Sequence, residues 1–237
     1  NREPDVETTL TKNPIYWGDV RSNITTAVFA PIKSPSTRVA SFLSGDLDMM
    51  YPAPLQDVER LNKTNGLQVL QSPDVRTIFF GLDQSSPELK YSNVKGKNPF
   101  KDIRVRKAFY QAIDASLIQE KVMRGASKPT ALMVGRGLTG FDETLNNRMP
   151  HDPAASKILL TAAGYPDGFE VTLDCPNDRY VNDEAICQAV TIMLAKIGIK
   201  VDLNAQTKAK HFAKLNPAKD TSFYMLGWAS NSLDAYN

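Results

Sequence analysis

The spacing of apolar residues along the first third of the chain predicts alternating short strands and helices. Stretches rich in β-branched residues predict strands, and apolar residues three to four positions apart predict helices. The predicted strands are 6–10, 24–29, 47–50, 67–70 and 75–82, and the predicted helices are 36–43 and 55–61. This alternation indicates a layered α/β unit.

Turn-forming residues over 84–101 separate this part from a segment in which helical periodicity dominates. Asp102, Asp114 and Asp152 each stand directly before a helical pattern, where an aspartate side chain can cap the first turn. Between the second and third of these helices, the glycine-rich stretch 127–150 predicts an irregular loop.

The last segment is the most regular part of the chain. Strands are predicted over 170–174, 199–203 and 223–228, with a helix capped by Asn182 and a second helix over 209–215 between them. Short strand–helix–strand connections imply right-handed crossovers and therefore a parallel sheet.

Composition and charge exclude several classes of protein. The 237 residues, 42% of them apolar, can build one large core or two modest ones. The 28 basic and 26 acidic residues nearly balance without a basic cluster, which argues against nucleic-acid binding. No apolar run approaches the roughly 18 residues of a membrane helix. Because the chain starts at Asn1 without an apolar signal region, we expect a fragment whose export signal lies outside this sequence.

Cys175 and Cys187 lie twelve positions apart and predict a disulfide, with two buried free thiols as the alternative. Neither histidine, His151 or His211, has the ligand spacing of a metal site, so no metal is expected. His151 precedes a helix cap, and His211 stands among lysines on what is expected to be an exposed helix face. Neither histidine is in a recognisable catalytic context, so no catalytic residue and no cofactor is predicted.

Two polar loops follow predicted parallel strands, at the sheet edge where open α/β folds bind ligands. The first loop carries Asn177, Asp178, Arg179 and Tyr180, and the second follows Trp228 and carries Ser230, Asn231, Ser232 and Asp234. An arginine near aromatic, amide and carboxylate groups is what binding a zwitterion requires, because a guanidinium forks onto a carboxylate. Ordinary polar loops remain the alternative interpretation.

A series of motifs, in order and spacing, resembles the family 5 extracellular solute-binding proteins, the peptide- and nickel-binding group of ABC importers. The series covers nearly the whole chain from about Leu10 onward. Its members are Asn-Pro-Ile-Tyr-Trp at 13–17, Ser-Gly-Asp-Leu-Asp at 44–48, 100–108 with Ala-Ile-Asp at 112–114, Gly-Ala at 125–126, 152–160, Ala-Gly-Tyr-Pro at 163–166, Ile-Gly-Ile at 197–199 and Gly-Trp at 227–228.

The resemblance implies a type II, two-lobed periplasmic-binding-protein-like α/β fold, here a partial chain with mixed or parallel sheets flanked by helices. Residues 1–83 would form part of the first lobe and end in a hinge strand at 76–83. Residues 84–237 would form the second lobe, incomplete at its C-terminal end. Lobe closure on a ligand, rather than chemistry, would be the working step.

The implied partners are a small peptide or other small solute and the membrane subunits of an ABC permease, with no nucleic acid. The implied location is the periplasm, or the cell exterior with a lipid anchor, and the implied state is a monomer.

Peptide-binding relatives place an aspartate for the peptide amine where this chain has Asn231, so Asp234 would have to replace it. Arg179 lies near an arginine that engages the ligand carboxylate in some relatives. The alternatives are an α/β enzyme domain such as a small-molecule hydrolase, and a ligand sensor without transport.

Overall fold

The computed structural model describes residues 1–72, 74–232 and 234–236. The chain divides into two compact units, Asn1–Val69 (unit 1) and Leu70–Asn237 (unit 2). Within the described residues, no helix has both the length and the apolar character needed to cross a membrane.

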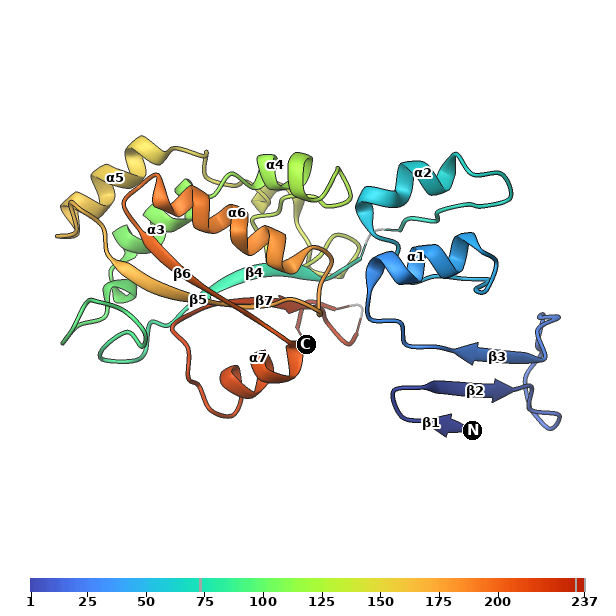
Figure 1. The fold of residues 1–237 in the computed structure, drawn as a ribbon. Helices are drawn as coiled ribbons and strands as arrows, with labels where there is room; N and C mark the ends of the chain where they lie inside the picture. Colours follow the sequence, from blue (N-terminus) through green and yellow to red (C-terminus); the bar gives the residue numbers. More distant parts are fainter. Residues whose placement is uncertain (73, 233, 237) are drawn as a thin grey trace. The chain divides into compact units, whose positions relative to one another are not determined.

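Unit 1 contains a small antiparallel sheet and two short helices (Figure 1). The strands β1 (Arg2–Glu3), β2 (Glu7–Thr11) and β3 (Thr26–Phe29) pair in sequence order. The helix α1 (Pro35–Leu43) follows, and a 3-10 turn (Leu55–Asp57) leads into α2 (Val58–Asn62). The helix α1 begins where the Ser34 hydroxyl accepts a hydrogen bond from the Thr37 N–H group.

Two strands that the sequence predicts in unit 1, 47–50 and 67–70, are wrong. The backbone around 67–70 bonds locally to the end of α2 instead of to a sheet. The Leu67 N–H group donates to the Thr64 carbonyl, and the Val69 N–H group donates to the side chain of Asn62 at 2.9 Å. Short apolar runs therefore predicted strands that found no partner strand.

Unit 2 is built on a four-stranded mixed sheet in the order β4-β7-β5-β6. The central strand β5 (Glu170–Pro176) is parallel to β6 (Lys200–Gln206) and to β7 (Phe223–Trp228). The edge strand β4 (Thr77–Leu82) is antiparallel to β7. The predicted parallel arrangement of the last three strands is thus confirmed.

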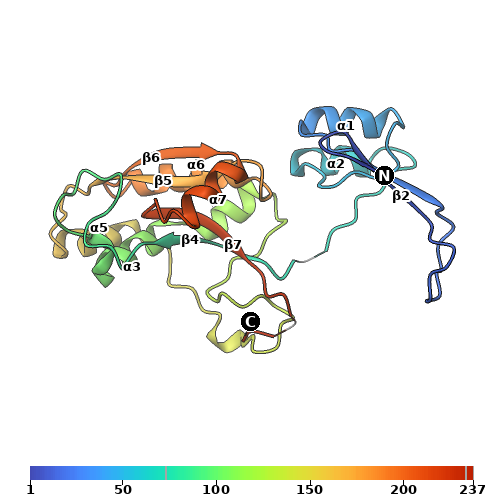
Figure 2. The same ribbon diagram turned by 90° about the horizontal axis from the view of Figure 1, so that it is seen from below.

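Helices cover both faces of this sheet. The helices α3 (Ile103–Ala112), α5 (Pro153–Ala162) and α6 (Asp183–Ala195) lie on one face, and α7 (Lys208–Leu215) lies on the other (Figures 1 and 2). The short α4 (Ala115–Leu117) continues into a π-helical turn (Ile118–Val122), and 3-10 turns occupy Pro99–Lys101 and Glu143–Leu145. The predicted α/β class, with a mixed sheet flanked by helices, is confirmed.

A cluster of phenylalanines forms the centre of the unit 2 core. Phe100 and Phe109 meet edge to face with ring centroids 5.2 Å apart, and both contact the rings of Phe169 and Phe223. All four side chains are buried. The cluster fixes α3 and the segment before it against β7, which places the carboxyl ends of the strands on a rigid base.

Three of the four predicted helix caps are confirmed. The carboxylates of Asp102, Asp114 and Asp152 each accept a hydrogen bond from a backbone N–H group in the first turn of the helix that follows, at 2.8 to 2.9 Å. Asn182 is not a side-chain cap. Its backbone is left-handed, with φ at 53°, and its side chain donates to the Val122 carbonyl at 2.8 Å.

The strand that we assigned to the hinge lies in the sheet of unit 2. Six residue pairs join β4 to β7, from Thr77 opposite Trp228 to Leu82 opposite Phe223. The lobe boundary at residue 83 and the hinge role stay predictions, although the compact units divide at residue 69.

Candidate functional site

The loop after β5 contains the first group of predicted ligand-binding residues. Asn177, Asp178 and Arg179 are exposed and Tyr180 is partly buried. The Asn177 N–H group donates to the Gln206 carbonyl at 3.0 Å, which extends the β5–β6 pairing into the loop. The Asp178 carboxylate accepts from the Lys208 N–H group at 2.5 Å, at the start of α7. The loop is therefore anchored to its neighbours on one side.

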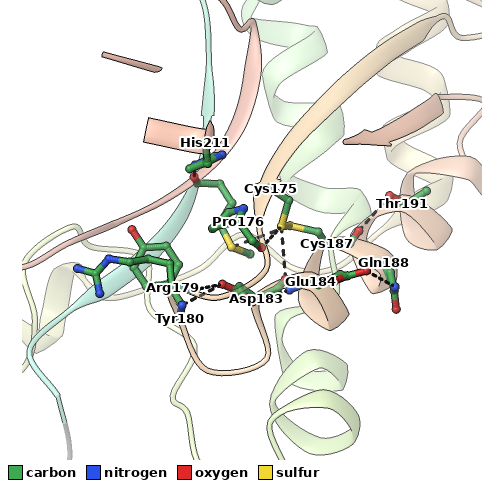
Figure 3. The surroundings of a disulfide bond; sticks show 11 residues. Cys175, Pro176, Arg179, Tyr180, Asp183, Glu184, Cys187, Gln188, Thr191 and His211 are labelled. Atoms are coloured by element: carbon green, nitrogen blue, oxygen red, sulfur yellow. Dashed lines mark hydrogen bonds between the residues drawn. A yellow bond between two sulfur atoms is a disulfide. The ribbon is translucent and has the colours of Figure 1, made fainter. Parts of the chain in front are cut away.

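Asp183, the first residue of α6, closes this loop from within. Its side chain is buried, and one carboxylate oxygen accepts hydrogen bonds from the N–H groups of both Arg179 and Tyr180, each at 2.9 Å (Figure 3). A negative charge at this position also suits the positive end of the helix dipole. The residue that holds the loop is thus Asp183, one position after the predicted Asn182.

A disulfide joins Cys175 at the end of β5 to Cys187 in α6 (Figure 3). The S–S distance is 2.07 Å, and both cysteines are fully buried. The structure therefore has the disulfide that the sequence predicts, and not two free thiols. The bond links the two elements that flank the loop carrying Arg179.

Tyr180 connects this loop to the end of β7. Its hydroxyl oxygen accepts a hydrogen bond from the Gly227 N–H group at 2.8 Å. A Cβ atom at Gly227 would lie only 2.8 Å from the Tyr180 ring and 2.6 Å from the side chain of Ile78. The ring therefore rests directly on a backbone that carries no side chain, and the first predicted loop here contacts the end of the strand from which the second loop starts.

The remaining predicted residues, at the end of β7 and in the loop after it, differ in whether they bond to their own chain. Trp228 is 52% exposed, and Asn231 is exposed. Asp234 forms an isolated parallel bridge with Thr139, and its carboxylate accepts from the Tyr236 N–H group at 2.8 Å. The Asp234 carboxylate is thus engaged with its own chain, whereas Trp228 and Asn231 face solvent. A ligand-binding role stays a prediction for the residues Asn177, Arg179, Tyr180, Trp228, Asn231 and Asp234.

His211 is buried, and the prediction that it lies on an exposed helix face is wrong. Its Nε2 atom lies 3.0 Å from the Met225 carbonyl oxygen, so α7 turns this side chain toward β7. Lys208 and Lys210 are exposed on other faces of the helix, which explains the misleading pattern, whereas Lys214 also turns toward the sheet. Burial lowers the pKa of His211, because the charged imidazole loses its hydration.

A buried ion pair lies on the same face of the sheet. Lys214 of α7 lies 2.8 Å from the carboxylate of Asp174, which is fully buried in β5, and the Asn204 side chain donates to the same oxygen at 2.7 Å. The Lys214 ammonium also lies 4.2 Å from the ring centroid of Tyr91. These contacts hold α7 against the sheet. They do not involve the loops at the carboxyl edge, which are held by other residues.

Arg76 lies beside Gly227 and Tyr180 and is not among the residues that the sequence predicts for the site. It directly precedes β4, and its Cδ atom would lie 3.0 Å from a Cβ atom at Gly227, close to the Tyr180 ring. The antiparallel pairing that brings Thr77 opposite Trp228 joins residues about 150 positions apart. No local pattern in the sequence signals that pairing.

Within the described residues, no group of three or more His, Cys, Asp or Glu side chains is placed to hold a metal ion. At the carboxyl edge, the described residues form a polar surface that carries the guanidinium of Arg179, the phenol of Tyr180 and the indole of Trp228. Such a surface can form hydrogen bonds to a ligand and stack against it.

The family model for the middle part of the bacterial extracellular solute-binding proteins of family 5 matches residues 1–237. The glutathione-binding protein GsiB of Salmonella choleraesuis is 24% identical over 224 residues, which cover 93% of this chain and 41% of that protein. The chain thus spans about two fifths of the length of that relative.

Two solved structures share the fold. The periplasmic binding protein DppA from Helicobacter pylori, in complex with the peptide STSA, matches with a TM-score of 0.84 and 23% identity over 99% of this chain and 42% of its own. The dipeptide binding protein from Pseudoalteromonas sp. SM9913, in complex with Met-Leu, matches with a TM-score of 0.83 and 21% identity over 100% of this chain and 44% of its own. The predicted periplasmic-binding-protein-like fold is confirmed.

Proposed function

Because the chain belongs to the bacterial extracellular solute-binding proteins of family 5, we propose that it is part of the substrate-binding component of an ABC importer. That component captures a peptide or similar small solute and delivers it to a membrane permease. GsiB is named for binding glutathione, and the two solved relatives hold peptides, which supports a ligand of this class.

The observation that carries this proposal is the contact between the polar loop after β5 and the last residues of β7, at the carboxyl edge of the parallel strands. The Tyr180–Gly227 hydrogen bond joins that loop to β7 just before the second polar loop begins, and Arg179 and Trp228 remain exposed. Ligands of open α/β sheets bind at this edge. The surface offers a guanidinium for a carboxylate and aromatic rings for apolar contact.

Six residues form the proposed ligand-binding set. Arg179 engages a ligand carboxylate, and Tyr180 and Trp228 supply ring surface, while Asn177 and Asn231 supply amide hydrogen bonds. Asp234 serves a ligand amine through its second carboxylate oxygen, since Oδ1 accepts from the Tyr236 N–H group. The residues proposed to bind ligand are Asn177, Arg179, Tyr180, Trp228, Asn231 and Asp234.

We further propose that the protein is a periplasmic monomer that works without a cofactor and has no enzymatic activity. The contacts of its histidines support the absence of catalysis. His211 is buried against a backbone carbonyl, and His151 lies 3.6 Å from the Asp114 carboxylate. Both cysteines are in the disulfide, so neither supplies a thiolate nucleophile.

Titration calorimetry of the purified protein with a mixture of di- and tripeptides tests the function. We expect saturable heat, and we expect Arg179→Ala to weaken binding by about tenfold or more, since a charge-assisted hydrogen bond is lost. Arg136→Ala is the matched control, because Arg136 is an exposed arginine of the same unit that pairs with Glu143. Unchanged affinity in Arg179→Ala would remove Arg179 from the site, and absence of heat with every peptide would contradict the function.

A further inference from the structure

The cluster around Tyr180 contains two arginines, of which only Arg179 has been assigned a role. The guanidinium of Arg179 lies 5.1 Å from the centroid of the Tyr180 ring. The Cδ atom of Arg76 and the Cε1 atom of Tyr180 both lie within 3.0 Å of the point where a Cβ atom on Gly227 would sit. The Tyr180 ring therefore has the guanidinium of Arg179 over it and the aliphatic part of the Arg76 side chain beside it.

The acidic residues near Arg179 bond to backbone groups and not to its guanidinium. Asp178 directs its carboxylate to the Lys208 N–H group, and Asp183 directs its carboxylate to the backbone of the loop. Within the described part of the chain, Arg179 forms no ion pair. Figure 3 shows its guanidinium pointing away from Asp183 and from the disulfide. Its positive charge is therefore available to a ligand.

Arg76 is only weakly neutralised. One of its terminal nitrogens lies 3.4 Å from the Asp74 carboxylate, and Asp74 is 62% exposed. A contact of this length and exposure contributes little, and a guanidinium has five N–H donors. Arg76 is itself one-third exposed, so its remaining donors can reach solvent or a ligand. Tyr180 thus has the guanidinium of Arg179 on its ring and the side chain of Arg76 beside it. Within the described residues, the one ion pair formed by these two arginines is the exposed contact of Arg76 with Asp74.

We propose that Arg76 and Arg179 form a paired-guanidinium site around Tyr180 and that the ligand is a solute with two carboxylates. This inference rests on the proposed function and names its substrate class. Each planar guanidinium forks onto one carboxylate, so two of them favour a dianionic solute over one with a single negative charge. In the empty protein the two like charges repel each other, and an anionic ligand relieves that repulsion.

Gly227 and Tyr180 make this pairing possible. The absence of a side chain at Gly227 lets the stem of Arg76 and the ring of Tyr180 approach the same point from two elements. The hydrogen bond from the Gly227 N–H group fixes the ring, and Asp183 fixes the backbone on which Arg179 stands. Both arginines are therefore held by rigid parts of unit 2.

The test compares two dipeptides, Ala-Glu and Ala-Gln, which differ in one carboxylate and have nearly the same shape. The purified protein is titrated with each peptide, as wild type, Arg76→Gln and the matched control Arg136→Gln. We expect the wild type and the control to bind Ala-Glu about tenfold or more tightly than Ala-Gln. We expect Arg76→Gln to bring that ratio close to one with little change for Ala-Gln.

The outcomes separate the two proposals. A wild type that binds both peptides equally, or a ratio that survives in Arg76→Gln, would overturn the paired site and leave the proposed function standing. A wild type that binds neither Ala-Glu nor Ala-Gln would also overturn the paired site, whereas the proposed function is contradicted only if the whole mixture of di- and tripeptides gives no heat. A melting temperature for Arg76→Gln equal to that of the wild type shows that any loss of the ratio comes from the lost charge and not from misfolding.

Discussion

Breaking the disulfide between β5 and α6 should lower the unfolding free energy of unit 2. Cys175 and Cys187 are separated by twelve positions. In the chain-entropy model, removing a cross-link that closes a loop of this length costs about 3 kcal/mol of unfolding free energy. For a unit of the size of Leu70–Asn237, this corresponds to a fall of roughly 6 to 12 °C in melting temperature.

Two perturbations separate the cross-link from the packing of the sulfur atoms. Reduction of the wild type breaks the bond but keeps both sulfurs, so its effect reports the cross-link. The double variant Cys175→Ala/Cys187→Ala also removes the two sulfurs, which are fully buried, and leaves space in the core. We expect the double variant to melt below the reduced wild type, because a cavity adds to the loss.

The assay is thermal unfolding followed by circular dichroism, with thiol titration in denaturant as a control. Without reductant the titration should find no free thiol, and after reduction it should find two. The reasoning fails if the reduced protein, with both thiols measured, melts at the same temperature as the oxidised one. It also fails if the native protein shows two reactive thiols before reduction.

Three further predictions follow from other contacts. Gly227→Ala should destabilise unit 2 by about 1 to 3 kcal/mol in urea unfolding, because the new methyl overlaps the Tyr180 ring; unchanged stability would show that the ring moves freely. Asp183→Ala should cost about 1 to 3 kcal/mol and speed hydrogen exchange at the two loop amides it accepts from, and unaltered exchange would contradict its role. Burial holds the pKa of His211 below its ordinary value of 6.5, so the unfolded chain takes up the proton first as pH falls. This residue should therefore leave stability unchanged above pH 6.5 and reduce it progressively below, and a His211→Gln variant with the same slope as wild type would refute this.

Local patterns predicted the helices well because their signals are close together in sequence. An aspartate and the N–H group that it caps are two or three residues apart, as at Asp102, Asp114 and Asp152. The strands of the last segment were also predicted: 170–174 and 199–203 alternate apolar with polar residues, and 223–228 is an apolar run. The short runs 47–50 and 67–70 looked the same in sequence but lie outside every strand.

The candidate site was predicted only in part, for a related reason. Its two loops could be placed because parallel strands end at a common edge, and the Tyr180–Gly227 contact joins the first loop to the end of β7, where the second loop starts. Arg76 could not be placed beside Gly227, because it precedes β4, an antiparallel edge strand that lies far from β7 in the sequence. The buried His211 was misjudged because Lys208 and Lys210, which stand next to it in sequence, lie on the exposed side of α7.

The pairing of β4 with β7 has a mechanical consequence. Thr77 and Trp228 lie opposite each other at one end of this antiparallel pair, and Leu82 and Phe223 lie at the other end. A force that pulls Thr77 and Trp228 apart loads the cross-strand bonds one at a time, as in unzipping, instead of all together in shear. The β4–β7 pairing should therefore separate at low force, beginning at the Thr77–Trp228 pair.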